Sequence, residues 1–109
     1  LGSTMLWRFG PGGTIERSRD AGQSWQSQAS PITAELLAGS APAENVCWIV
    51  GRDGTILRTT DGEHWEKIFS PVVADWVAID ARSASLATIT SRDTARYSTA
   101  DGGRTWRRQ

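Results

Sequence analysis

A short phrase built around Asp, Gly and Trp occurs three times in this chain of 109 residues and constrains its fold more than any other feature. The copies occupy residues 18–25, 59–65 and 99–106, and their aspartates lie at positions 20, 61 and 101. Repetition with a period of about 40 residues is typical of stacked supersecondary units, and one four-stranded propeller blade takes about 40 to 45 residues. The chain is therefore predicted to fold as successive blade-like units.

The segments between the phrases have the composition of short strands separated by turns. In the middle repeat, residues 46–51 are rich in β-branched and aromatic side chains, and Asp53-Gly54 favours a tight hairpin turn into a strand over 55–59. Strands are also expected over 32–40 and 65–69, with a turn at 41–45, although residues 34–38 have some helical propensity. The flanking repeats predict strands over 7–10, 14–18, 76–80, 86–90 and 95–98.

These expectations define the fold class. We predict an all-β fold of about three four-stranded antiparallel blade-like repeats, a partial β-propeller whose first blade is incomplete. The chain is one domain, 1–109, with units at approximately 5–28, 32–70 and 74–109.

The repeated phrase can be explained as a turn that is held by its own side chains. The Asp accepts hydrogen bonds from the backbone of the turn, the Gly adopts a conformation that a Cβ disfavours, and the Trp buries a large ring. The predicted structural residues are Asp20, Gly22, Trp25, Asp61, Gly62, Trp65, Asp101, Gly103 and Trp106. The alternative makes the aspartates catalytic groups or calcium ligands. The structural interpretation is favoured because equivalent positions in successive units place the carboxylates a blade apart.

The phrase resembles the Asp-box, or BNR, repeat of Ser/Thr-x-Asp-x-Gly-x-Ser/Thr-Trp, with the second copy one residue short. The run from Val50 to Gly62 is similar to the repeats of propellers of the photosystem II assembly-factor type. That resemblance implies a non-enzymatic scaffold that binds proteins and helps to assemble or stabilise a larger complex. It also favours an extracytoplasmic location. Asp-box repeats occur in sialidases as well, so the alternative function is a carbohydrate-binding or glycosidase-derived propeller piece.

A search for catalytic, metal or cofactor residues finds no consistent set. Glycoside hydrolysis normally needs two facing carboxyl groups, and the only tyrosine, Tyr97, has no glutamate near it in sequence. His64 is the sole histidine and is expected to be an exposed spacer, while the sole cysteine, Cys47, is expected to be buried. We therefore predict no enzyme activity, no metal site and no cofactor.

Charge and hydropathy narrow the class of partner. Twelve basic and twelve acidic residues give zero formal charge, so no overall field attracts nucleic acid, and no apolar run is long enough to span a membrane. No signal peptide is visible at the start of the given sequence. Eleven of the basic residues are Arg, which reflects either bidentate contacts or genomic base composition.

Two predictions concern the partner. Arg17 and Arg58 repeat at one strand position, and with Arg96 and Arg52 they form the best candidate partner-binding surface. The alternative is that these arginines pair with nearby acids such as Glu16 or Asp61, or are simply solvated. Propellers need about four to eight blades to close, so the open edges are expected to be covered. The cover is a second copy of the chain, another part of a parent chain, or a subunit of a larger complex.

Overall fold

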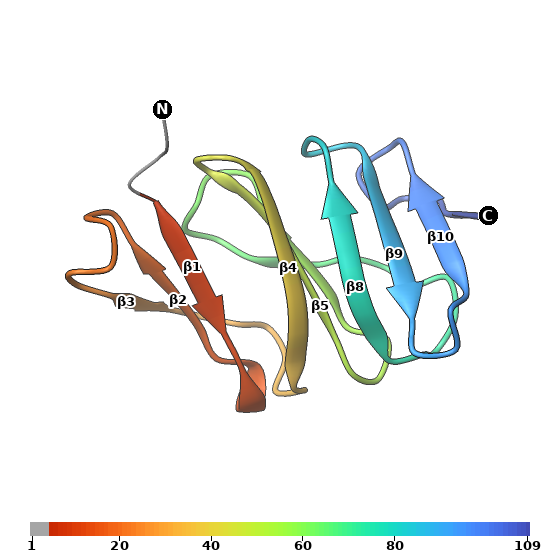
Figure 1. Ribbon diagram of the computed structural model, residues 1–109, viewed down its shortest axis with the longest axis horizontal. Coiled ribbons are helices and arrows are strands. Elements are labelled where there is room, and N and C mark those ends of the chain that lie inside the picture. Colours follow the sequence, from red (N-terminus) through yellow and green to blue (C-terminus); the bar gives the residue numbers. More distant parts are fainter. Residues whose placement is uncertain (1–4) are drawn as a thin grey trace.

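The computed structural model describes residues 5–109 and contains three antiparallel sheets in succession. The sheets follow one another along the long axis of the molecule, with the N-terminal sheet at one end and the C-terminal sheet at the other (Figure 1). The prediction of an all-β partial propeller is confirmed. Its strands are β1 Leu6–Phe9, β2 Ile15–Ser18, β3 Gln26–Gln28, β4 Leu36–Ala43, β5 Val46–Gly51, β6 Ile56–Thr59, β7 Glu66–Lys67, β8 Trp76–Ala81, β9 Ala87–Ser91, β10 Arg96–Thr99 and β11 Arg107–Arg108.

Each sheet is an antiparallel meander, and we call the three sheets blades 1, 2 and 3 in chain order. Blade 2 has the strand order β4-β5-β6-β7 and blade 3 has the same kind of order, β8-β9-β10-β11, so each has four strands. Within residues 5–109, blade 1 has three strands, β1-β2-β3, and its β1 matches the second strand of the other blades. A single 3-10 turn, Pro11–Gly13, connects β1 and β2.

The hairpin between β5 and β6 shows why the sequence turns where it does. Asp53 and Gly54 have φ values of 60° and 75°, which is the pair of left-handed residues that a type I′ turn requires. The innermost strand of blade 2 begins later than expected, at Leu36, and runs through residues 41–43, which the sequence assigned to a turn. Its helical propensity is overridden because Leu36 is buried between blades and the strand is paired with β5.

The apolar core lies between the blades. Side chains alternate along a strand, so β5 and β6 send one set toward blade 1 and the other toward blade 3. The cluster between blades 1 and 2 contains Ile15, Leu36, Cys47, Ile49, Leu57 and Trp65. The cluster between blades 2 and 3 contains Trp48, Val50, Ile56, Ile68, Trp76, Ala81, Ala87, Ile89 and Tyr97. We call these two interfaces seam 1–2 and seam 2–3. Residues 5–109 include no helix long and apolar enough to cross a membrane.

Candidate functional site

The Asp-box carboxylates are occupied by hydrogen bonds within their own turns. Asp20 accepts bonds from the Ser24 hydroxyl (2.6 Å), the Ser24 amide (2.8 Å) and the Ser18 hydroxyl (2.8 Å). These bonds, those from Ser24 first, lower the pKa of Asp20 to about 2. In the third box Thr105 and Thr99 bind Asp101 in the same way, and the pKa of that carboxyl is also well below its ordinary value.

The carboxylate of the second box is also held by hydrogen bonds from its own turn, although this turn is one residue shorter. Asp61 accepts hydrogen bonds from the amides of His64 (2.8 Å) and Glu63 (2.9 Å), which lower its pKa, and it also contacts Nδ1 of His64 at 2.7 Å. The contact with Asp61 raises the pKa of His64, whose ring is exposed as predicted. Across residues 5–109 no group of three or more His, Cys, Asp and Glu side chains could hold a metal ion. The geometry supports the structural interpretation of the boxes.

Two arginines connect successive blades. Arg58 on β6 donates from Nη1 to the carbonyl oxygens of Ala84 (2.8 Å) and Gly102 (3.1 Å) in blade 3, and from Nε and Nη2 to Glu66 in its own blade. Arg17 on β2 donates from Nη1 to the carbonyl oxygen of Gly62 in blade 2. Gly62 and Gly102 each follow the Asp of a box, so the two seams use the same acceptor.

An indole accompanies each of these arginines. Trp7 packs edge-to-face on Trp65 across seam 1–2, with ring centroids 5.4 Å apart, and the Arg17 guanidinium lies over the Trp7 ring at 5.7 Å. Across seam 2–3, Trp48 meets Trp106 at 6.3 Å, and Arg58 lies 5.4 Å from the Trp48 ring. Each seam therefore pairs an Arg and a Trp of one blade with the box Gly and Trp of the next.

The two seams differ in how completely their polar atoms are satisfied. In seam 2–3, Trp48 Nε1 donates to the Ser83 carbonyl at 3.0 Å, and Glu66 binds Arg58. In seam 1–2, Trp7 Nε1 and Arg17 Nε are buried and have no hydrogen-bond partner in the described chain. The residue opposite Arg17 is Gln26, where the residue opposite Arg58 is Glu66.

The four arginines predicted from the sequence do not form one surface. The Arg17 side chain is only 2% exposed, so the expectation of an exposed residue is wrong there: the next blade covers it. Arg58 is largely engaged in seam 2–3, and Arg52 pairs with Glu35 at 2.8 Å. Arg96 is exposed on β10, and its side chain has no hydrogen bond or ion pair within residues 5–109.

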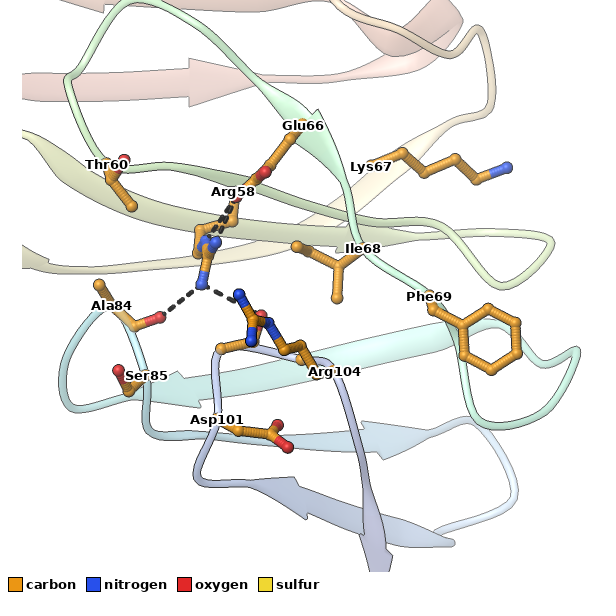
Figure 2. A pocket seen from close by; sticks show the side chains of 12 residues that line it. Arg58, Thr60, Glu66, Lys67, Ile68, Phe69, Ala84, Ser85, Asp101 and Arg104 are labelled. Carbon is orange, nitrogen blue, oxygen red and sulfur yellow. Dashed lines mark hydrogen bonds and ion pairs between the residues drawn. The ribbon is translucent and has the colours of Figure 1, made fainter.

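A groove of about 560 Å³ lies over seam 2–3, between the outer strand of blade 2 and the third Asp box. Arg58 lies in it with its bonds to Glu66 and Ala84, and the side chains of Lys67 and Phe69 extend together on one side (Figure 2). Phe69 is 76% exposed. Lys67 and Arg104, which also line the groove, have no ion pair or side-chain hydrogen bond in the described part of the chain.

Sequence reasoning missed Lys67, Phe69 and Arg104. Lys67 is the only lysine, which was a usable signal, and Arg104 occupies a variable position inside the box. Phe69 was assigned to a returning strand, but β7 ends at Lys67 and leaves the ring in solvent.

The chain matches a protein family and solved structures of that family. The model of the family described as photosynthesis system II assembly factor YCF48 matches residues 7–109, which confirms the resemblance drawn from the Asp boxes. A solved structure titled "YCF48 bound to D1 peptide" is 28% identical, with a TM-score of 0.83, over 95% of this chain and 35% of its own. YCF48 from Cyanidioschyzon merolae is 26% identical, with a TM-score of 0.83, over 96% of this chain and 33% of its own. The chain thus spans about a third of these structures, and no curated protein matches it.

Proposed function

The chain belongs to the photosynthesis system II assembly factor YCF48 family, and we propose on that premise that it is a non-enzymatic binding module that helps to assemble or stabilise a larger protein complex. One of the matched structures is a YCF48 with a D1 peptide bound. We extend peptide binding to this chain, with an extended segment of a partner protein as the ligand. The D1 peptide itself is the probe with which to begin.

The groove over seam 2–3 is the proposed site, and its uncompensated charge is the observation that carries the proposal. Arg58 is neutralised by Glu66, and the carboxylate of Asp101 stays ionised with its oxygens hydrogen-bonded inside its own turn, which leaves the groove with one more cation than anion. Lys67 and Arg104 are left as two cations beside the exposed ring of Phe69. Such a surface suits a peptide that offers acidic side chains to the cations and an apolar side chain to the ring.

The corresponding place on seam 1–2 has a different chemistry. Register and box alignment put Ser27, Ala29 and Glu63 where seam 2–3 has Lys67, Phe69 and Arg104. Neither the cations nor the aromatic ring are repeated there. The proposal therefore assigns peptide binding to seam 2–3 alone. Arg52 and Arg96 lie outside the groove and are retained as proposed contacts to other parts of a partner.

Fluorescence anisotropy with a labelled D1 peptide tests this site. Charge reversal by Lys67→Glu with Arg104→Glu is expected to raise the Kd at least about tenfold, since two favourable charge contacts become repulsive. The matched control reverses Arg19 and Arg108, which are exposed and lie outside the groove, and changes the net charge equally. The control is expected to change the Kd by less than about twofold.

Equal weakening in both double variants would mean attraction by overall charge, and no weakening in either would remove the groove from the proposal. A glycan array addresses the carbohydrate alternative. Saturable sugar binding that survives the Lys67 and Arg104 reversals, with no peptide binding, would replace the proposed function.

A further inference from the structure

A second pocket with an apolar lining adjoins the groove over seam 2–3. It has a volume of about 620 Å³ and is formed by the linker between β7 and β8 together with the turn between β5 and β6. We call it the linker pocket. Lys67, Ile68 and Phe69 line both the groove and the linker pocket, so the two are continuous. The Phe69 ring extends away from Asp101 and the third box, toward the side on which the linker continues (Figure 2).

The linker exposes apolar side chains within a few residues of one another. Val73 is 89% exposed, and Phe69 and Val72 are exposed as well. The other large apolar side chains that are exposed within residues 5–109, Leu6 and Leu86, lie apart from these three in sequence. Scattered exposed apolar residues are ordinary, but a cluster of them beside a groove indicates a contact surface.

Hydrogen bonds attach the backbone of this linker to the blades. The indole of the third box donates to the carbonyl oxygen of Phe69 at 2.9 Å, and Nε1 of the buried Trp76 donates to Ser70 Oγ at 3.1 Å. The amide of Gly54, in the turn between β5 and β6, donates to the carbonyl oxygen of Ala74 at 2.7 Å. The apolar side chains are therefore presented by a backbone that is already held in place, which lowers the entropic cost of binding.

The two ends of the combined surface differ in charge. The end at the third box has the unpaired cations Lys67 and Arg104. The other end has Asp53, which is exposed and whose carboxylate has no hydrogen bond or ion pair within the described chain. An acidic side chain of a ligand is attracted at the first end and repelled at the second. The surface therefore favours one order of side chains in its ligand.

The strand geometry also sets a spacing. The amide of Ile68 donates to the carbonyl oxygen of Ile56 at 2.8 Å, so pairing with β6 continues past the end of β7. Lys67 and Phe69 lie two residues apart, on the same side (Figure 2). Side chains on one side of an extended chain recur every two residues, or about 6.6 Å. An extended ligand alongside this segment can thus place an acid at Lys67 and, two residues away, an apolar side chain at Phe69.

We propose that the ligand of this surface is a bipartite peptide. An acidic side chain binds at Lys67 and Arg104, a large apolar side chain two residues away covers Phe69, and a further apolar side chain enters the linker pocket against Val72 and Val73. This inference deepens the peptide binding proposed above and rests on it. A lipid surface fits less well, because Asp53 would lie against headgroups that are often anionic.

Two labelled peptides of equal composition, capped at both ends, test the order of side chains by fluorescence anisotropy. The first has two glutamates, a glycine and two leucines in that order, and the second has one glutamate moved beyond the leucines. The first is expected to bind at least about fivefold more tightly, because the moved glutamate meets Asp53. Asp53→Asn should remove most of this preference, and Asn tolerates the φ of 60° at this position. Asp93→Asn, an exposed site outside both pockets, is the matched control and should leave the preference unchanged.

A double variant of the chain tests the linker pocket itself. Val72→Ser with Val73→Ser is expected to raise the Kd of the first peptide about tenfold, because apolar contact area is lost. The same factor is expected at low and high salt, whereas the effect of reversing Lys67 and Arg104 should shrink as salt is added. Both valines are exposed, so the fold should be retained. Leu86→Ser removes an exposed apolar side chain outside both pockets and should change the Kd less than about twofold.

The outcomes separate this inference from the proposed function. Equal affinity for the two peptides, or an unchanged Kd in the Val72 and Val73 variant, overturns the bipartite ligand, while a D1 peptide that still depends on Lys67 and Arg104 keeps the groove as a binding site. Loss of that dependence removes both. Vesicles of phosphatidylcholine and phosphatidylglycerol supply the last comparison. Binding to these vesicles that requires Val72 and Val73, with no affinity for either peptide, would replace the peptide with a lipid surface.

Discussion

Arg17 is bound less completely than Arg58, and Gln26→Glu should correct this. Gln26 lies opposite Arg17 in the ladder, as Glu66 lies opposite Arg58. Glu66 binds Nε and Nη2 of Arg58, whereas Nε of Arg17 is buried without a partner. A carboxylate at position 26 can accept from this nitrogen and should stabilise the fold.

The size of the gain follows from the geometry of the Arg58–Glu66 pair. A hydrogen bond to a charged group contributes about 1.5 to 3 kcal/mol when it is shielded, but exposed ion pairs contribute about 0.2 to 1 kcal/mol. The side chains of Arg58 and Glu66 are 18% and 56% exposed, so the pair lies between these limits. We expect Gln26→Glu to raise the free energy of unfolding by about 1 kcal/mol. For a domain of this size that is a rise in Tm of roughly 4 °C.

Urea unfolding at low and high salt, followed by tryptophan fluorescence, measures the effect. Glu66→Gln removes the corresponding pair from seam 2–3 and should lower the unfolding free energy by a similar amount, so the double variant should be close to wild type. The gain from Gln26→Glu should shrink at high salt, because the new carboxylate is partly exposed. The reasoning is refuted if the gain persists in an Arg17→Met background, since the stabilisation would then come from elsewhere.

Three further predictions concern titration, reactivity and backbone strain. The stability that comes from the lowered pKa of Asp20 is fully present above the ordinary carboxyl pKa of about 3.9 and should fall as the pH drops toward about 2. The pKa of His64 is raised, so the stability that His64 contributes should fall as the pH rises through the raised value. Thermal melts of wild type and His64→Ala across pH separate the two contributions. Cys47 is buried, and burial raises its pKa to about 12, so iodoacetamide should label it in urea but not in the folded chain; equal rates would contradict the assigned burial. Gly102→Ala should lower the free energy of unfolding, measured in urea, by about 1 to 3 kcal/mol more than Gly12→Ala does. Both glycines have a left-handed φ, but only a Cβ at Gly102 meets an arginine, so equal losses would contradict this reasoning.

Much of the architecture could be predicted from the sequence because its determinants are local. The Asp boxes, the Asp53-Gly54 turn and the strand Val46–Gly51 each depend on residues that are close together in the chain. The strand predicted over 76–80 is also present as β8, Trp76–Ala81, and its first residue, Trp76, is fully buried. The start of β4 at Leu36 was less predictable, because it is fixed by packing between blades.

The role of Arg17 and Arg58 shows where local reasoning stops. Alignment on the boxes correctly put the two side chains on the same side of equivalent strands, but whether that side faces solvent depends on the next blade, 45 and 44 residues away along the chain. The sequence did contain a signal for this contact. Boxes 2 and 3, which each follow an arginine-bearing blade, have Gly directly after the Asp, while the first box has Ala21.

Positions that repeat and positions that do not repeat therefore have different physical roles in this chain. An Arg that recurs with a Gly forty-odd residues later donates to buried carbonyl oxygens, and a side chain used in that way has few N–H donors left for a ligand. Lys67 and Arg104 have no such acceptor, and their counterparts on seam 1–2 are Ser27 and Glu63. The groove therefore has free cationic side chains because these two positions do not follow the repeat.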